Sequence, residues 1–329
     1  QYQKMTGTPI PNLIVSLAIP TIISMMVTSI YNMADTFFVS QLGTSAAGAV
    51  GIVFSLMAII QAVGFTLGMG SGSLSSRLLG QQRGKEADEV GSTAFFTAIA
   101  FGLILTVGGL FFLDGLMKLL GATATILPYA RDYARYILYG APFMCASFVL
   151  NNLLRSQGRA VLSMVGIGFG GVLNMILDPI FIFVLGFGIS GAAIATVLSQ
   201  CVSFSILLFC FLSGKSIIRL RFGNISRRGA VYADILKTGF PSFCRQGLAS
   251  AASVALNVNA AVYGDAAVAA MSIVGRVFMF IQSFMMGFGQ GFQPVAGYNY
   301  GAKQYERVRQ AYWFTVRVGI LVLTCLGAI

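Results

Sequence analysis

Two aspartates lie inside stretches that are otherwise long enough and apolar enough to cross a lipid bilayer. Asp35 lies in the run that begins at Asn12, and Asp178 lies in the run that begins at Val161. A charged group at membrane depth costs roughly 2.5 to 3.5 kcal/mol on insertion scales, so its presence there needs a reason. Because the chain has only ten carboxylates, two of them at this depth indicate a pathway for a cation or a proton.

Further oxygen-bearing groups accompany the two acids. Asn174 precedes Asp178 by four residues, so the two side chains share a helix face. Pro179 lacks a backbone donor and frees a carbonyl oxygen about one turn back. With the Thr196 hydroxyl and the Asp35 carboxylate, these oxygens would be enough to bind Na⁺, and without Na⁺ one of the crowded acids would hold a proton. The structural alternative is that Asp178 only caps a proline kink and that Asp35 lies in the headgroup region.

Other polar residues are candidates for lining a substrate cavity, although hydrogen bonds between helices would also explain them. They are Thr28, Tyr31 and Asn32 near Asp35, Asn151 in the fourth run, Pro179, Gln200 one turn beyond Thr196, and Arg245 and Arg276. The two arginines lie well inside runs of the second half, where either snorkelling to the interface or a functional ion pair would account for them.

The composition identifies the surroundings of these residues. Hydrophobic residues make up 57% of the chain and charged residues 9%, whereas soluble domains have about 45 to 50% and about 25%. Runs of at least about 18 apolar residues can cross a ~30 Å hydrocarbon core as helices, and an outer-membrane barrel would show short alternating segments instead. Nine such runs cover residues 13–39, 46–74, 92–113, 129–154, 161–185, 189–213, 235–261, 266–296 and 310–329. We therefore expect an all-α polytopic membrane protein.

The basic residues are sorted by side of the membrane. Fifteen of the lysines and arginines lie in or near alternate connections between the runs, and only three, Lys118, Arg131 and Arg135, lie in the other connections. The fifteen are Lys4, Arg77, Arg83, Lys85, Arg155, Arg159, Lys215, Arg219, Arg221, Arg227, Arg228, Lys237, Lys303, Arg307 and Arg309. The positive-inside rule then predicts a cytoplasmic N-terminus in the inner (plasma) membrane. This distribution accounts for the net charge of +11 without a nucleic-acid partner.

Several kinds of chemistry lack support in the sequence. The five cysteines lie within apolar runs and form no CxxC spacing, which is typical of small core residues. Histidine is absent, so a proton carried near neutral pH would travel on a carboxylate. No metal-ligand cluster and no nucleophile with a base at usable spacing is present, so a membrane-embedded enzyme is disfavoured. We expect no cofactor other than a coupling ion, Na⁺ or H⁺.

The first part of the chain recurs in the second part. An ungapped shift of 221 positions superimposes identical residues, among them Pro20 on Pro241, Gln61 on Gln282, Gly68 on Gly289, Gly70 on Gly291 and Gly80 on Gly301. We interpret this as a duplication. Six runs separate the two copies, and an even number returns the chain to the same side, so the copies are predicted to be parallel repeats.

The duplication predicts two bundles of six helices. Residues 1–222 would form the first bundle, and residues 223–329 would form the first three helices of the second. The polar, basic segment 213–229 is the natural boundary. By comparison with the first copy, the second is expected to need about 100 further residues, or three helices, beyond Ile329.

Three segments resemble the multidrug and toxic compound extrusion (MATE) transporters. They are AIPTIISMMVTSIYNMADTFFVSQLG in the first helix, LNMILDPIF in the fifth, and GFGQGFQPVAGYNYGAKQYERV in the second half. Matched position by position, the resemblance implies a cation site at Asp35, Asn174, Asp178 and Thr196. The aspartate in the first helix resembles the bacterial and archaeal branch related to the DNA-damage-inducible transporters.

The resemblance also implies a fold and an activity. It implies twelve helices in two lobes of six, around a central cavity that opens alternately to the two sides of the membrane. It implies export of small amphipathic, often cationic compounds by antiport with Na⁺ or H⁺, and we expect a monomer. The alternative is a lipid-linked saccharide flippase of the same superfamily, which would need a large cavity lined by arginines such as Arg245 and Arg276.

Overall fold

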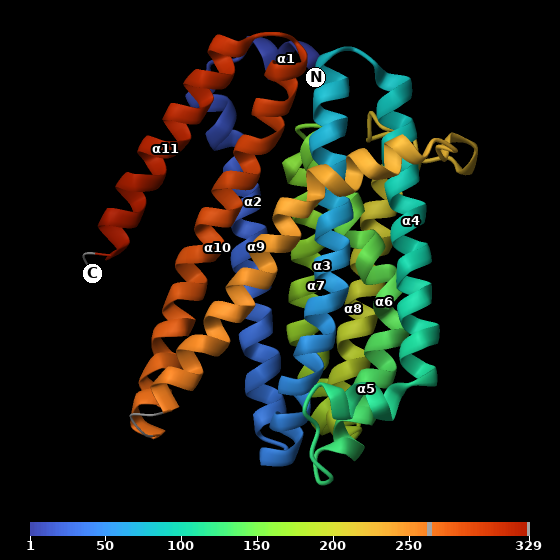
Figure 1. Cartoon of the computed structure of the whole chain (residues 1–329), viewed down its shortest axis with the longest axis vertical. Coiled ribbons are helices and arrows are strands. Elements are labelled where there is room, and N and C mark those ends of the chain that lie inside the picture. Colours follow the sequence, from blue (N-terminus) through green and yellow to red (C-terminus); the bar gives the residue numbers. More distant parts are fainter. Residues whose placement is uncertain (262–264, 328–329) are drawn as a thin grey trace.

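The chain folds into long, roughly parallel helices, as the composition predicts. The structure is a computed structural model that describes residues 1–261 and 265–327 (Figure 1). Each of the nine predicted runs corresponds to one long helix. These are α2 (Ile10–Ser40), α3 (Thr44–Gly80), α4 (Gly84–Phe111), α6 (Leu127–Ser156), α7 (Ala160–Pro179), α8 (Gly188–Leu212), α9 (Gly229–Ala261), α10 (Asp265–Gly301) and α11 (Tyr305–Gly327). Among the described residues, seven of the spans are long and apolar enough to cross a membrane by composition alone.

Short elements that the apolar runs do not predict complete the fold. The helix α1 (Tyr2–Gly7) precedes the first span, and α5 (Leu113–Leu119) lies between α4 and α6. The five-residue π-helix η1 (Ile180–Val184) continues α7 beyond Pro179. Proline breaks the α-helical hydrogen bonding here, and π-turns of this kind recur near functional sites. The local irregularity expected at Pro179 is therefore present, next to Asp178.

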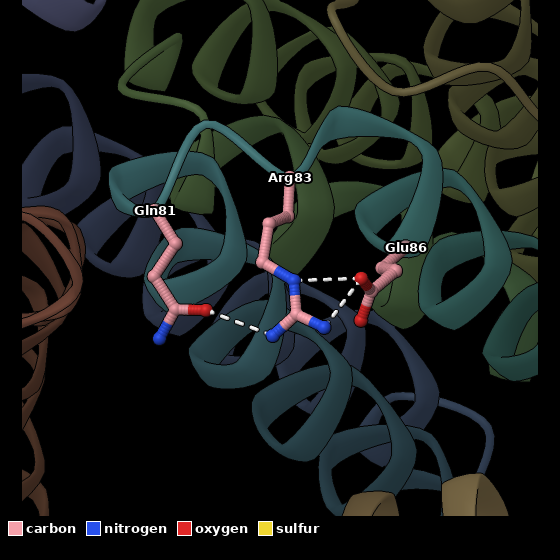
Figure 2. Close-up of polar contacts among 3 residues, drawn as sticks. All are labelled: Gln81, Arg83 and Glu86. Atoms are coloured by element: carbon pink, nitrogen blue, oxygen red, sulfur yellow. Dashed lines mark hydrogen bonds and ion pairs between the residues drawn. The ribbon is translucent and has the colours of Figure 1, made fainter.

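Basic connections gather at one end of the molecule. The turns α3–α4, α6–α7 and α10–α11 and the segment between α8 and α9 all lie at the end that is uppermost in Figure 1. Figure 2 shows one of these turns, where Arg83 pairs with Glu86 at 2.5 Å and also donates to Gln81. This exposed pair contributes little to stability, typically less than about 1 kcal/mol.

The segment between α8 and α9 is docked onto the first bundle. The buried Gln157 Oε1 accepts hydrogen bonds from the Ser216 hydroxyl at 2.9 Å and from the Ile217 amide at 2.6 Å. Farther along, the Arg219 amide donates to Asp88 at 2.8 Å, and the Ser226 amide donates to Thr93 at 2.8 Å. The connection is thus fixed to the first bundle as far as Ser226.

The structure reproduces the duplication helix by helix. Shifting α3 by 221 positions gives the bounds of α10, and the start of α4 falls on the start of α11. The packing repeats as well, because α3 lies against α9 and α10 lies against α2, the equivalent pair. A Cβ on Gly80 would overlap the backbone of Tyr298. A Cβ on Gly301, the repeat equivalent of Gly80, would overlap the backbone of Arg77, which is the repeat equivalent of Tyr298. The two copies therefore meet along a seam with approximate two-fold symmetry.

Candidate functional site

A polar cluster lies inside the first bundle, at the junction of three helices. Asp35 comes from α2, Asn174 and Asp178 from α7, and Thr196 from α8. All four side chains are buried, with Asp178 fully inaccessible to solvent. The Asn174 amide donates to Asp178 Oδ1 at 3.2 Å and lies 3.3 Å from Thr196 Oγ1. Asp35 lies close enough to Asp178 for their charges to interact.

Several buried oxygens of this cluster lack a partner. Asp35 Oδ1, Asn174 Oδ1 and Asp178 Oδ2 form no hydrogen bond within the described part of the chain. Leaving a buried acceptor unsatisfied costs about 1 to 3 kcal/mol, and more for a charged group. Two acids, an amide and a hydroxyl therefore form a donor set that a small monovalent cation or a proton would satisfy. The described residues contain no group of three His, Cys, Asp or Glu side chains suited to a transition metal.

Two tyrosines enclose the acids. Tyr133 from α6 is 1% exposed, and its hydroxyl group lies within electrostatic range of both Asp35 and Asp178. Tyr31 is one turn before Asp35 on α2 and also faces both carboxylates. Tyr31 is among the residues predicted from the sequence, and Tyr133 is not, because a single tyrosine in an apolar run gives no periodic signal.

A cavity of about 270 Å³ separates the acids from the second lobe. It is lined by six of the residues predicted from sequence, namely Thr28, Tyr31, Asn32, Asn151, Gln200 and Arg245. Pro179 ends α7 and is not among the lining residues. Arg276 belongs to α10, but its side chain lies outside the described part of the structure.

Further lining residues were not predicted as site residues. Gln61 from α3 and Gln282 from α10 both face the cavity, and they are repeat equivalents of each other. The one sequence feature that could have indicated them is that the same residue, glutamine, occurs at both equivalent positions of the repeat. Across the same space the hydroxyls of Ser29 and Ser283 form a 2.6 Å hydrogen bond between the lobes. The polar lining is thus shared by both halves.

The lobes are in contact at the end that carries the basic connections. Arg155 from α6 is 4% exposed, and its guanidinium donates to Gln290 of α10 and to Asn152 at 2.5 Å. Gln293 of α10 donates to the Ser73 hydroxyl at 2.6 Å. These contacts join the two lobes at this end. A second hollow, lined by α2 and α3 with Met279 of α10, lies on the other side of Asn32 and Gln61.

Comparison with known proteins identifies relatives along the whole chain. The "Multidrug export protein MepA" of Staphylococcus aureus (strain NCTC 8325 / PS 47) is 27% identical over 330 residues, which cover 100% of this chain and 73% of that protein. The protein of the same name from Staphylococcus haemolyticus (strain JCSC1435) is 26% identical over 313 residues, covering 95% of this chain and 69% of that protein.

Solved structures share the fold. A MATE crystal structure in complex with MaL6 has a TM-score of 0.95 and 31% sequence identity, covering 99% of this chain and 73% of that one. A MOP superfamily transporter from Pyrococcus furiosus Vc1, described as having a binding pocket of reverse polarity that suggests a different function, has a TM-score of 0.92, 32% identity and the same coverage. The sequence model of the MatE family matches residues 20–180 and 241–329. This multi-pass membrane protein therefore belongs to the MatE (MATE) family of transporters, and not to a family of enzymes.

Proposed function

We propose that the protein exports small amphipathic, drug-like compounds by antiport with Na⁺ or H⁺. The observation that carries the proposal is the set of unsatisfied buried oxygens on Asp35, Asn174 and Asp178 beside a cavity between two lobes. The multidrug export activity named for the MepA proteins supports the choice of substrate. The aspartate at position 35 is our reason for proposing the branch related to the DNA-damage-inducible transporters. We expect a monomer.

Coupling requires that the ion bind differently in two arrangements of the lobes. An ion held equally well in both would shift no equilibrium, however tightly it bound. The four donors come from three helices, α2, α7 and α8. Neutralising the acids would remove the repulsion between Asp35 and Asp178 and change how α2 packs on α7. Because α2 also packs along α10, that change would reach the second lobe.

The charge distribution sets the proposed direction of transport. The positive-inside rule predicts that the basic connections face the cytoplasm and that the protein lies in the inner (plasma) membrane. Since the lobes touch at that end, we propose that this arrangement is closed to the cytoplasm and releases substrate to the outside.

The test replaces Asp178 by Asn in protein reconstituted into vesicles. Na⁺ and pH gradients are imposed separately, and the flux of two amphipathic dyes, one anionic and one cationic, is measured. Asp178→Asn should retain the fold and lose ion-driven flux. Asp114→Asn is the matched control, because Asp114 is exposed and its ion pair is with the exposed Arg131. Full gradient-driven flux in Asp178→Asn would refute the role given to the cluster.

A further inference from the structure

The cavity between the lobes has an uneven distribution of charge. Among the described residues that line it, Arg245 of α9 is the one with a formal charge, and none is acidic. The remaining polar lining consists of amides, hydroxyls and the Tyr31 phenol, with Asn32, Gln61 and Gln282 among the amides. Amide NH₂ groups and a guanidinium are hydrogen-bond donors, and they favour an acceptor-rich or negatively charged group.

Within the part of the chain that the structure describes, Arg245 borders the central cavity. The side chain is exposed, and it forms no ion pair with any described acidic residue. It borders both the central cavity and an adjoining hollow lined by Ser242 and Gln290. Because Arg245 has no ion pair with a described acidic residue, its guanidinium donors can pair with an acceptor that enters the cavity.

The charge is not required by the architecture of the seam. The repeat equivalent of Arg245 is Ser24 of α2, which is buried and donates to the Pro20 carbonyl of its own helix at 2.9 Å. The same position in the other half thus folds with a small neutral side chain. Arg245 is therefore a feature of this cavity and not of the repeated fold.

The two membrane acids do not cancel this charge within the cavity. Asp35 is 5% exposed and Asp178 is fully buried, and neither lines the cavity. Tyr31, Gly171 and Gln200 form the wall on their side. A coupling ion or proton bound at the acids would cancel one of their two negative charges, and Arg245 is the charged side chain that lines the described part of the cavity.

The rest of the cavity suits an apolar body of drug size. Phe65 and Phe148 pack with ring centroids 4.7 Å apart, and both rings line the cavity with Met25, Met279 and Met286. Aromatic rings and methionines adapt to ligands of varied shape. A volume of about 270 Å³ is close to the lower limit of common small-molecule sites, about 300 Å³.

We propose that the substrates are small amphipaths that carry an anionic group, such as a carboxylate, sulfonate or phosphate, and that Arg245 is the residue that selects for this charge. The inference rests on the proposed export function and differs from the cationic substrates that the family resemblance implies. The apolar body lies against Phe65, Phe148 and the methionines, and the anion pairs with the guanidinium.

The experiment uses two fluorescent amphipaths that share one aromatic body and differ only in carrying a sulfonate or a quaternary ammonium. Equilibrium binding to the purified protein is measured without any gradient, and flux is measured in vesicles. The wild type should bind the sulfonate more tightly. Arg245→Gln should weaken sulfonate binding by about 10-fold to 100-fold, the usual effect of losing a charge-assisted pair, and should leave binding of the ammonium compound equal or tighter.

A charge reversal separates selection from damage. Arg245→Glu should invert the preference and bind the ammonium compound more tightly than the sulfonate, which a misfolded protein would not do. Arg83→Gln is the matched control, because Arg83 is an exposed arginine that pairs with Glu86 (Figure 2) and does not line the cavity, and it should behave as wild type. A labelled anionic phospholipid is included as a third ligand. Its translocation without transport of the sulfonate would overturn the assignment to small anions.

The outcomes distinguish this inference from the proposed function. Gradient-driven flux of the ammonium compound alone, unchanged in both Arg245 variants, would overturn the inference and leave export intact. Absence of flux for both compounds under both gradients would refute export, while the binding measurements would still decide the charge preference of the cavity.

Discussion

The contact between Arg155 and Gln290 gives the sharpest energetic prediction for the lobe seam. Arg155 is 4% exposed and Gln290 is 5% exposed, and no acidic residue in the described part of the chain pairs with the guanidinium. Its Nε group has no described partner. The buried charge therefore depends on two amide oxygens, those of Gln290 across the seam and of Asn152 on its own helix.

The perturbation is Gln290→Met, which keeps the side-chain volume and removes the acceptor. A hydrogen bond to a charged group contributes about 1.5 to 3 kcal/mol, and a buried charge that loses its partner carries the full cost. When the lobes separate, water hydrates Arg155 and the cost disappears. Gln290→Met should therefore shift the equilibrium toward opening at the basic end by about 10-fold to 150-fold.

A double variant tests the sign of the effect. Arg155→Met removes both the hydrogen bond and the buried charge, and replacing a buried charge with an apolar side chain is often neutral or stabilising. Combined with Gln290→Met, it should return the equilibrium close to that of the wild type. The coupling between the two substitutions measures the interaction itself.

The assay reports opening through a cysteine at position 76. Ser76 is fully buried at the seam, opposite Gly297, so Ser76→Cys in a background without the five native cysteines reacts with a soluble maleimide only when the lobes part. The labelling rate should rise in Gln290→Met and fall back in the double variant. Equal labelling rates in all three proteins would refute the idea that this hydrogen bond holds the seam.

Two further predictions concern the seam and the segment between α8 and α9. Gly239→Ala should lower the unfolding midpoint in detergent, because the new Cβ would overlap the Thr66 carbonyl and overpacking costs about 1 to 3 kcal/mol. Gly247→Ala on the same helix is the control and should leave the midpoint unchanged, because a Cβ there meets nothing within 4 Å. Gln157→Leu should increase tryptic cleavage within residues 213–228 by about 10-fold, because the Ile217 amide loses its hydrogen-bond acceptor. Gln81→Leu, at an exposed position, should leave cleavage unchanged. Unchanged cleavage in Gln157→Leu would argue against docking of this segment onto the first bundle.

The sequence allowed the helices and the cluster of acids to be anticipated, for different reasons. Apolar runs mark each span because the bilayer demands them, and the 221-residue shift matches α3 to α10. Asn174 and Asp178 share a face through local helix geometry, which a sequence displays directly. The structure brings Asp35 and Thr196 to the same cluster, as the family resemblance implies.

Contacts between distant segments could not be anticipated in the same way. Tyr133, Arg155 and Gln290 depend on how α6 meets its neighbours, and nothing in their spacing reveals that packing. Gln157 resembled any polar residue after a helix, yet it accepts hydrogen bonds from Ser216 and Ile217, some 60 residues away. Such roles arise from tertiary packing and leave no periodic trace along the chain.

Gly80 lies so close to Tyr298, and Gly301 so close to Arg77, that a Cβ on either glycine would overlap its neighbour. Because the repeat relates these two contacts, the patch formed by the four residues is self-complementary. Each half contributes the same surface, as in an isologous dimer. A half-length ancestor bearing one copy could pair with a second molecule of itself, so that any substitution in the patch altered two contacts at once. With both copies in one chain, each can vary alone, and the position that is Ser24 in one copy is Arg245 in the other.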